Sequence, residues 1–170
     1  MKGLNNRVAV VTGAASGIGR AISNRFAEEG VEVFGIDLQV GDMPENQSLV
    51  GHVQVDLTHE HSTNLILDFL SSYTKKCDIL VNAAGVSEFG FFDDKDMSLF
   101  ERTMAVNLEA VARITRAFLP LLRESNQGRI INIGSICSEF ASPGLSAYVI
   151  SKHAVLGLTR ALASELPSEG

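Results

Sequence analysis

The sequence predicts an α/β protein whose core is a doubly wound parallel sheet of about five strands with helices on both faces. Short apolar runs rich in β-branched residues alternate along the chain with longer segments of helical period. Such alternation indicates right-handed strand–helix–strand units, and these build a parallel sheet. The strand runs are almost continuously apolar, which is typical of strands that are covered on both faces.

Each predicted element follows from its own segment. The expected strands span residues 7–12, 31–36, 53–57, 78–82 and 129–134. The expected helices span residues 17–29, about 65–73, 98–124 and 147–166. Pro120 lies inside the third of these helices, and because proline lacks a backbone N–H and crowds the preceding turn, we expect a kink there.

Composition narrows the function. The 170 residues suit one domain over 1–170, and 45% hydrophobic with 20% charged residues is ordinary for a globular protein. A net charge of −6 disfavours nucleic acid or an anionic membrane as a partner. The first apolar run is too short for a signal peptide or a membrane span. Cys77 and Cys137 are far apart and match no metal spacing, so we expect a cytoplasmic protein with no metal site.

A glycine-rich turn, TGAASGIG, lies between the first expected strand and the first expected helix. Its glycines permit a tight turn and let backbone N–H groups approach a pyrophosphate, to which the helix N-terminus adds unpaired donors. A plain strand–helix turn is the alternative. The position of the motif after a strand and before a helix favours dinucleotide binding, with contacts from Gly13, Ser16, Gly17, Ile18 and Gly19.

Polar or small residues follow three further strands. Asp37 ends the second expected strand, 18 residues after Gly19, where its carboxylate can bind both ribose hydroxyls and repel a 2′-phosphate. This favours NAD over NADP. Asp56 ends the third expected strand and either meets the adenine amino group or serves a turn. At the end of the fourth strand, small residues allow a flat ligand to approach the backbone in the segment Asn82, Ala83, Ala84 and Gly85.

Three residues near the last expected helix form a candidate catalytic group. Tyr148 and Lys152 are four residues apart, so both side chains lie on one face of that helix. An unperturbed tyrosine has a pKa of about 10, and a nearby ammonium is expected to lower that pKa toward the range of a general acid or base. Ser135 follows the fifth strand and would face the same cleft.

These motifs together resemble the short-chain dehydrogenase/reductase family, whose fold is Rossmann-type. The resemblance rests on TGAASGIG, the Asn-Ala-Ala-Gly segment, and Ser135 placed 13 residues before Tyr-x-x-x-Lys, and it covers the whole chain. It implies hydride transfer between NAD(H) and the carbon of a carbonyl or secondary alcohol, with the protein moving the proton.

The resemblance also implies residue roles. Tyr148 would exchange a proton with the substrate oxygen, and Ser135 would hydrogen-bond that oxygen. Lys152 would bind the nicotinamide ribose, and Asn107 would support a water-linked proton relay; on its own, Asn107 is read as a helix-surface or kink residue. Asp56 and Leu57 would contact adenine.

Members of the family usually continue into further strands, so the resemblance implies that this chain lacks the last strands and is a fragment of a longer enzyme. Two hypotheses stay open: an NAD-dependent oxidoreductase, or a non-catalytic dinucleotide-binding or interaction module. The presence of all four catalytic candidates favours the first. The helices from Ser98 and Ala147 correspond to the usual subunit interface of the family, which implies a homodimer or homotetramer.

Overall fold

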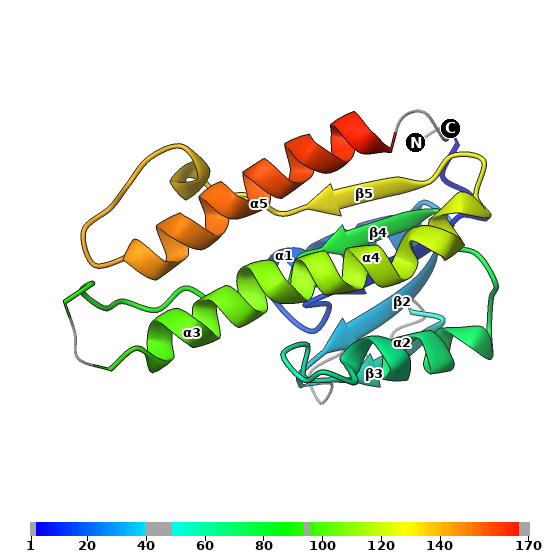
Figure 1. The fold of residues 1–170 in the computed structure, drawn as a ribbon. Coiled ribbons are helices and arrows are strands. Elements are labelled where there is room, and N and C mark those ends of the chain that lie inside the picture. Colours follow the sequence, from blue (N-terminus) through cyan, green and yellow to red (C-terminus); the bar gives the residue numbers. More distant parts are fainter. Residues whose placement is uncertain (1–2, 40–48, 94–95, 167–170) are drawn as a thin grey trace.

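The sheet of the computed structural model is parallel throughout, with strand order β3-β2-β1-β4-β5 (Figure 1). The structure describes residues 3–39, 49–93 and 96–166. The strands are β1 (Val8–Thr12), β2 (Glu32–Asp37), β3 (Gly51–Gln54), β4 (Ile79–Asn82) and β5 (Arg129–Asn132). The predicted five-stranded parallel α/β fold is therefore confirmed, and the strand order reverses direction between β1 and β4, where open sheets of this kind bind ligands.

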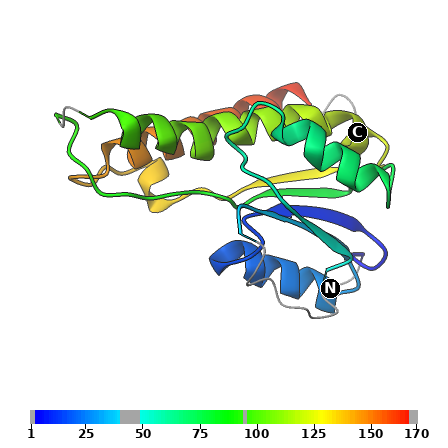
Figure 2. The ribbon, with the colours of Figure 1, turned by 90° about the horizontal axis from the view of Figure 1, so that it is seen from below.

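Helices cover both faces of the sheet (Figure 2). One face packs against α1 (Gly17–Glu28), and the other against α2 (Ser62–Ser71) and α4 (Ala110–Arg123). The central strand serves both cores, because Val8 and Val10 belong to the α2–α4 side while Ala9 and Val11 belong to the α1 side. This alternation is the period-two geometry of a strand with two buried faces.

The remaining helical segments lie around α4 and β5. They are α3 (Ser98–Met104), a π-helical turn η1 (Ala105–Glu109), a short 3₁₀ turn η2 (Ile136–Ser138) and α5 (Ser146–Glu165). No helix among the described residues is both long and apolar enough to cross a membrane.

Two sequence predictions need correction. The third strand was expected over residues 53–57, but β3 covers Gly51–Gln54 and pairs with β2 alone. After Val55 the chain turns, because the Asp56 carboxylate accepts the backbone N–H of Thr58. The segment expected as one helix over residues 98–124 forms α3, the π-helical turn η1 and α4, and α4 runs through Pro120 to Arg123.

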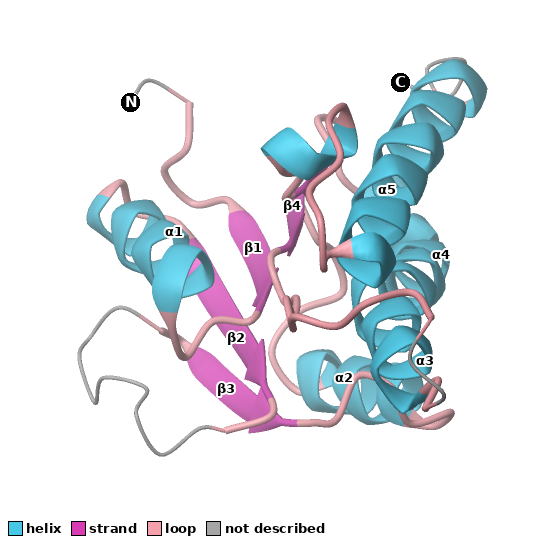
Figure 3. Cartoon of the chain, turned by 90° about the vertical axis from the view of Figure 1, so that its left-hand side faces the viewer, coloured by secondary structure: helices cyan, strands magenta, loops and turns pink. Residues whose placement is uncertain are grey.

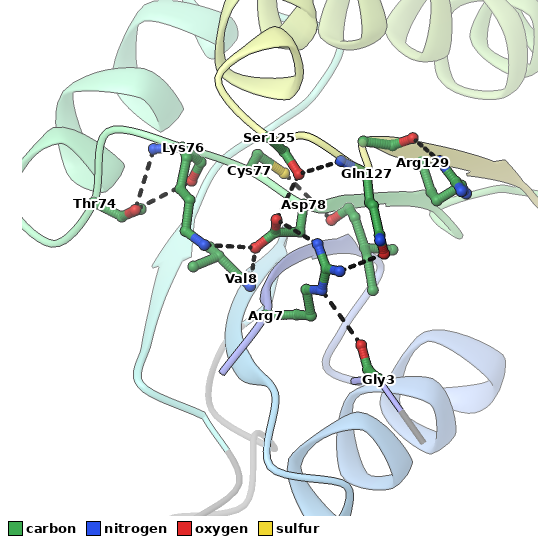
Figure 4. Close-up of polar contacts among 12 residues, drawn as sticks. Gly3, Arg7, Val8, Thr74, Lys76, Cys77, Asp78, Ser125, Gln127 and Arg129 are labelled. Carbon is green, nitrogen blue, oxygen red and sulfur yellow. Dashed lines mark hydrogen bonds and ion pairs between the residues drawn. The ribbon is translucent and has the colours of Figure 1, made fainter. Parts of the chain in front are cut away.

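A polar cluster joins the N-terminal ends of β1 and β4 (Figure 4). The glycine-rich turn lies at the opposite, C-terminal ends of the strands. The buried Asp78 carboxylate accepts hydrogen bonds from the Val8 backbone N–H at 2.8 Å and the Ser125 hydroxyl at 2.5 Å. Arg7 and Lys76 form ion pairs with it at 3.1 and 3.2 Å. The cluster holds the N-terminal ends of the strands together, whereas the candidate site lies at their C-terminal ends.

Candidate active site and dinucleotide cleft

The glycine-rich turn connects β1 to α1 at the C-terminal ends of the strands, which face the viewer in Figure 3. Gly13 has φ +69°, and a Cβ there would lie 2.8 Å from the backbone nitrogen of Ala84. A Cβ on Gly19 would overlap the Gly13 carbonyl oxygen. Both positions therefore require glycine for backbone packing.

The start of α1 offers backbone donors. Ser16 is the N-cap residue, and its side chain makes no capping hydrogen bond. The first N–H groups of a helix have no partner within it, so the donors of Gly17, Ile18 and Gly19 are available to an anion. The Ile18 side chain beside them is exposed.

Asp37 is held by backbone groups on both sides. One carboxylate oxygen accepts the Ala15 N–H at 2.9 Å, and the other accepts the Gln39 N–H at 3.1 Å. The bond from Ala15 ties the end of β2 to the glycine-rich turn, and the bond from Gln39 closes a local turn after β2. Because an ionised carboxylate has about four lone-pair sites, both oxygens can still accept a hydroxyl.

The end of β4 is fixed by Thr12, a role that the sequence analysis did not assign. The Thr12 hydroxyl accepts the backbone N–H groups of Ala83 and Ala84, both at 3.1 Å. The predicted contact Asn82 is buried, and its amide donates to Asn132 at 2.8 Å and to Thr115 at 3.1 Å. Asn82 thus packs between β5 and α4, while Ala83 and Gly85 line the cleft.

A cavity of about 730 Å³ brings most of the predicted cofactor residues together, within the size range of small-molecule and cofactor pockets. The predicted residues on its wall are Gly13, Ser16, Gly17, Ile18, Gly19, Asp37, Asp56, Leu57, Ala83 and Gly85. Two arginines near it were missed by the sequence analysis. Arg102 lines the cavity, and Arg113 of α4 donates to the Leu57 carbonyl.

Asp56 has the turn role that was weighed against adenine binding. One of its oxygens accepts the Thr58 N–H at 2.8 Å and the Thr58 hydroxyl at 2.7 Å. These hydrogen bonds lower the pKa of Asp56, so its carboxylate is ionised at neutral pH. The side chain still borders the cavity, so the turn role does not remove it from the cleft.

Ser135 caps the 3₁₀ turn η2. Its hydroxyl oxygen accepts the Cys137 N–H at 3.1 Å, while its own N–H donates to the Ser138 hydroxyl at 3.1 Å. This reciprocal capping box fixes the rotamer of Ser135 and leaves the O–H free to donate outward. The Ser-x-x-Ser spacing is the sequence signal that would have identified Ser138.

Lys152 lies beside Tyr148 on α5, as their spacing predicted. The Lys152 ammonium donates to the Ile133 carbonyl at 2.8 Å and lies 5.7 Å from the centre of the Tyr148 ring. Burial lowers the pKa of Lys152. A Cβ on Gly85 would lie 3.8 Å from this ammonium, so the lysine adjoins the inner end of the cavity.

Asn107 sits in the π-helical turn η1 and is buried. Its side-chain oxygen accepts the Val86 N–H at 2.8 Å, and its amide donates to the Val86 carbonyl at 2.9 Å and to the Ser151 hydroxyl at 3.1 Å. Asn107 therefore joins the loop after β4 to α5. Ser151 is a further residue that the sequence analysis missed, although it lies within the Tyr-x-x-x-Lys motif.

Comparisons with known proteins agree with this arrangement. The sequence profile of the family described as short chain dehydrogenase matches residues 7–170. The chain is 36% identical over 176 residues to the 2-(R)-hydroxypropyl-CoM dehydrogenase of Xanthobacter autotrophicus, covering 97% of this chain and 70% of the relative.

Two solved structures have the same fold. Ligand-free aldohexose dehydrogenase of Thermoplasma acidophilum superposes with a TM-score of 0.89 at 32% identity, covering 98% of this chain and 64% of that one. A Beutenbergia cavernae protein described as an NAD(P)-dependent gluconate 5-dehydrogenase, with NADP bound at low occupancy, gives 0.88 at 34% identity, covering 98% and 69%. The chain thus spans about two thirds of the length of these proteins.

Among the described residues, no group of three or more His, Cys, Asp or Glu side chains is arranged to hold a metal ion. Both cysteines are buried and unpaired.

Proposed function

This chain belongs to the short-chain dehydrogenase family, and from that premise we propose that it transfers a hydride between NAD(H) and a carbonyl or secondary-alcohol substrate, with Tyr148 as general acid/base. The observation that carries the proposal is the junction at Gly85, where Lys152 and Asn107 meet the inner end of the dinucleotide cleft. The cofactor cleft therefore adjoins Lys152 and Asn107, the side chains that we assign to proton transfer.

The residues present fit a dinucleotide. Gly13 and Gly19 let the turn pack closely against neighbouring backbone, and the first N–H groups of α1 favour a pyrophosphate. Asp37 offers a fixed carboxylate for the ribose hydroxyls. When bound, NAD(H) supplies or accepts the hydride.

Asp37 favours NAD over NADP. A 2′-phosphate beside the Asp37 carboxylate would meet like charge and no compensating cation from the turn. Among the described residues that line the cavity, the one basic side chain is Arg102, and it is already paired with Glu88 at 2.9 Å.

The proton is handled by side chains around α5. The Ser135 hydroxyl, with its oxygen already engaged by Cys137, donates to the substrate oxygen. Tyr148 gives that oxygen a proton during reduction and takes it back during oxidation. The Lys152 ammonium stabilises the phenolate that results, and Asn107, whose side chain orders the Val86 segment, supports resupply of the proton.

A titration of the 170-residue chain with NADH and NADPH tests the proposal, followed through the fluorescence of the nicotinamide. We expect NADH to bind at least about tenfold more tightly than NADPH, a difference of about 1.4 kcal/mol. The variant Asp37→Asn should narrow that ratio.

The variant Tyr148→Phe is the matched test of catalysis. It should retain NADH binding and lose turnover of ketones by at least about a hundredfold. NADH binding with no turnover of any ketone or alcohol in the wild-type chain would instead favour a non-catalytic dinucleotide-binding module. A folded chain that binds neither cofactor would contradict the proposal.

We also propose that the chain is cytoplasmic and that it forms a homo-oligomer. The free cysteines are consistent with a reducing cytoplasm. Helices α3–α4 and α5 are the proposed interface of a homodimer or homotetramer.

A further inference from the structure

Two loops frame the approach to Ser135 and Tyr148: residues 86–93 after β4, and residues 139–145 between η2 and α5. They are tied together, because the Gly90 N–H donates to the Gly144 carbonyl at 2.9 Å and Gly90 forms a β-bridge with Leu145. Leu145 is the N-cap residue of α5, and Tyr148 lies in the first turn of that helix. The bridge therefore holds the first loop beside this first turn of α5, which we call the catalytic turn; Figure 1 shows both loops beyond the ends of β4 and β5.

The first loop has three exposed phenylalanines, and two of them, Phe89 and Phe91, pack against each other. Phe89 is 67% exposed and Phe91 is 56% exposed. Their ring centroids lie 5.3 Å apart in an edge-to-face arrangement, which is a favoured geometry for aromatic pairs. We call Phe89 and Phe91 the aromatic pair. Its exposure leaves apolar surface in water, which is costly unless a ligand or partner covers it.

The Gly144 backbone contacts the Phe89 ring of the aromatic pair. It has φ +72°, and a Cβ at this position would overlap the ring of Phe89. The ring therefore lies directly against the Gly144 backbone, four residues before Tyr148. A glycine with a left-handed backbone at this point both turns the loop and makes room for the ring.

The charges around the aromatic pair disfavour an anion. Residues 86–93 and 136–145 include Glu88, Asp93 and Glu139 and contain no Lys, Arg or His, and in the sequence that follows Lys95 stands between two aspartates. Arg102 forms an ion pair with Glu88 at 2.9 Å. On the side of Ser135, the exposed side chains of Ile136 and Phe140 add further apolar surface.

We propose that the aromatic pair binds the apolar body of a neutral ketone or secondary alcohol and that Phe89 is a specificity-determining residue for such substrates. This rests on the proposed function, because it assigns the part of the substrate that extends away from Ser135 and Tyr148. An aryl or alicyclic group packs on the rings while the carbonyl reaches the catalytic turn, and a substrate that carries a carboxylate or sulfonate is repelled.

The test compares two ketones that share a ring and a carbonyl and differ in charge: neutral acetophenone and anionic 4-acetylbenzoate. Binding to the 170-residue chain is measured by saturation-transfer NMR with and without NADH, alongside NADH oxidation. We expect acetophenone to bind at least about tenfold more tightly than 4-acetylbenzoate. The variant Phe89→Ser should lose about tenfold in acetophenone affinity, seen as a raised KM with little change in kcat.

Phe92→Ser is the matched control. Phe92 has the same exposure as Phe89, but its ring faces Phe100 of α3 at 6.4 Å instead of Gly144. This variant should change acetophenone affinity less than about twofold, within the range of ordinary surface substitutions, and NADH affinity should be equal in all three chains.

Several results would overturn the inference. These are equal or tighter binding of 4-acetylbenzoate, the same effect from Phe89→Ser and Phe92→Ser, or loss of a dimer in Phe89→Ser without any acetophenone binding to the wild type. Failure to bind NADH, with ketone discrimination intact, would instead contradict the proposed function and leave the apolar subsite standing.

Discussion

The buried charge of Asp78 holds the N-terminal ends of β1 and β4 together, away from the candidate site. Burial raises the pKa of Asp78, but the hydrogen bonds from Ser125 and Val8 and the cations of Lys76 and Arg7 outweigh it and lower the pKa to about 2. A carboxylate whose pKa falls on folding stabilises the folded state above its unfolded pKa of about 3.9. That stabilisation is lost as the pH falls through the folded value of about 2.

The variant Asp78→Asn should therefore unfold more easily at neutral pH. We expect the free energy of unfolding at pH 7 to fall by about 3 kcal/mol, because Arg7 and Lys76 keep their charges beside an uncharged amide. Between pH 4 and pH 2 the variant should also lose less stability than the wild type. Urea unfolding at a series of pH values measures both effects.

Asp68→Asn makes the same chemical change at an exposed position of α2 and serves as the control. It should shift the free energy of unfolding by less than about 0.5 kcal/mol. Equal stability of Asp78→Asn and wild type at pH 7 would show that the cluster contributes nothing to folding.

At the scale of elements, the π-helical turn η1 connects the fold to the chemistry. It carries the Asn107 side chain inward, where its amide group forms hydrogen bonds with the Val86 N–H, the Val86 carbonyl and the Ser151 hydroxyl. The turn thus fixes the start of the loop after β4 relative to α5. Single π-helical turns inside α-helices are frequent at functional sites.

The variant Asn107→Ala should release this connection. We expect a loss of about 2 kcal/mol in the free energy of unfolding, because the Val86 N–H and carbonyl lose their side-chain partners. We also expect kcat to fall more than NADH affinity, since the Val86 segment loses its link to α5, the helix that carries Tyr148 and Lys152. Asn107→Asp keeps the acceptor for the Val86 N–H and should recover part of the stability; no recovery would mean that the donor bonds dominate.

How far the sequence predicts these elements depends on whether the deciding interaction is local. The glycine-rich turn and the Tyr148–Lys152 face follow from short-range spacing, and both lie at the predicted places. The end of β3 depends on pairing with β2 and on the Asp56–Thr58 turn, which apolar periodicity does not reveal. The direction of the Asn82 side chain is hidden from the sequence for the same reason, because its partner Asn132 lies on another strand.

At the scale of the whole molecule, the sheet has two edge strands among the described residues, β3 and β5. Within the described residues, β5 pairs with β4 alone, and Ile131 is 41% exposed although buried strands dominate parallel sheets. A groove of about 430 Å³ runs along β5 between α4 and α5, with Leu122, Ile130 and Leu162 on its wall. An unpaired strand edge with apolar surface favours association with further chains.

We therefore expect the 170-residue chain to form open-ended species in addition to any closed homo-oligomer. Pairing of the β5 edge of one chain with the β3 edge of the next is a contact between two different surfaces and does not close on itself, so the species should grow with concentration. The variant Ile131→Lys places a charge on β5 and should remove species larger than a tetramer in sedimentation velocity. Leu65→Lys, which changes an exposed leucine of α2 in the same way, should leave the distribution unchanged. Large species that persist in Ile131→Lys would place the association surface away from β5, whereas their loss beside an intact dimer or tetramer would separate edge pairing from the proposed helix interface.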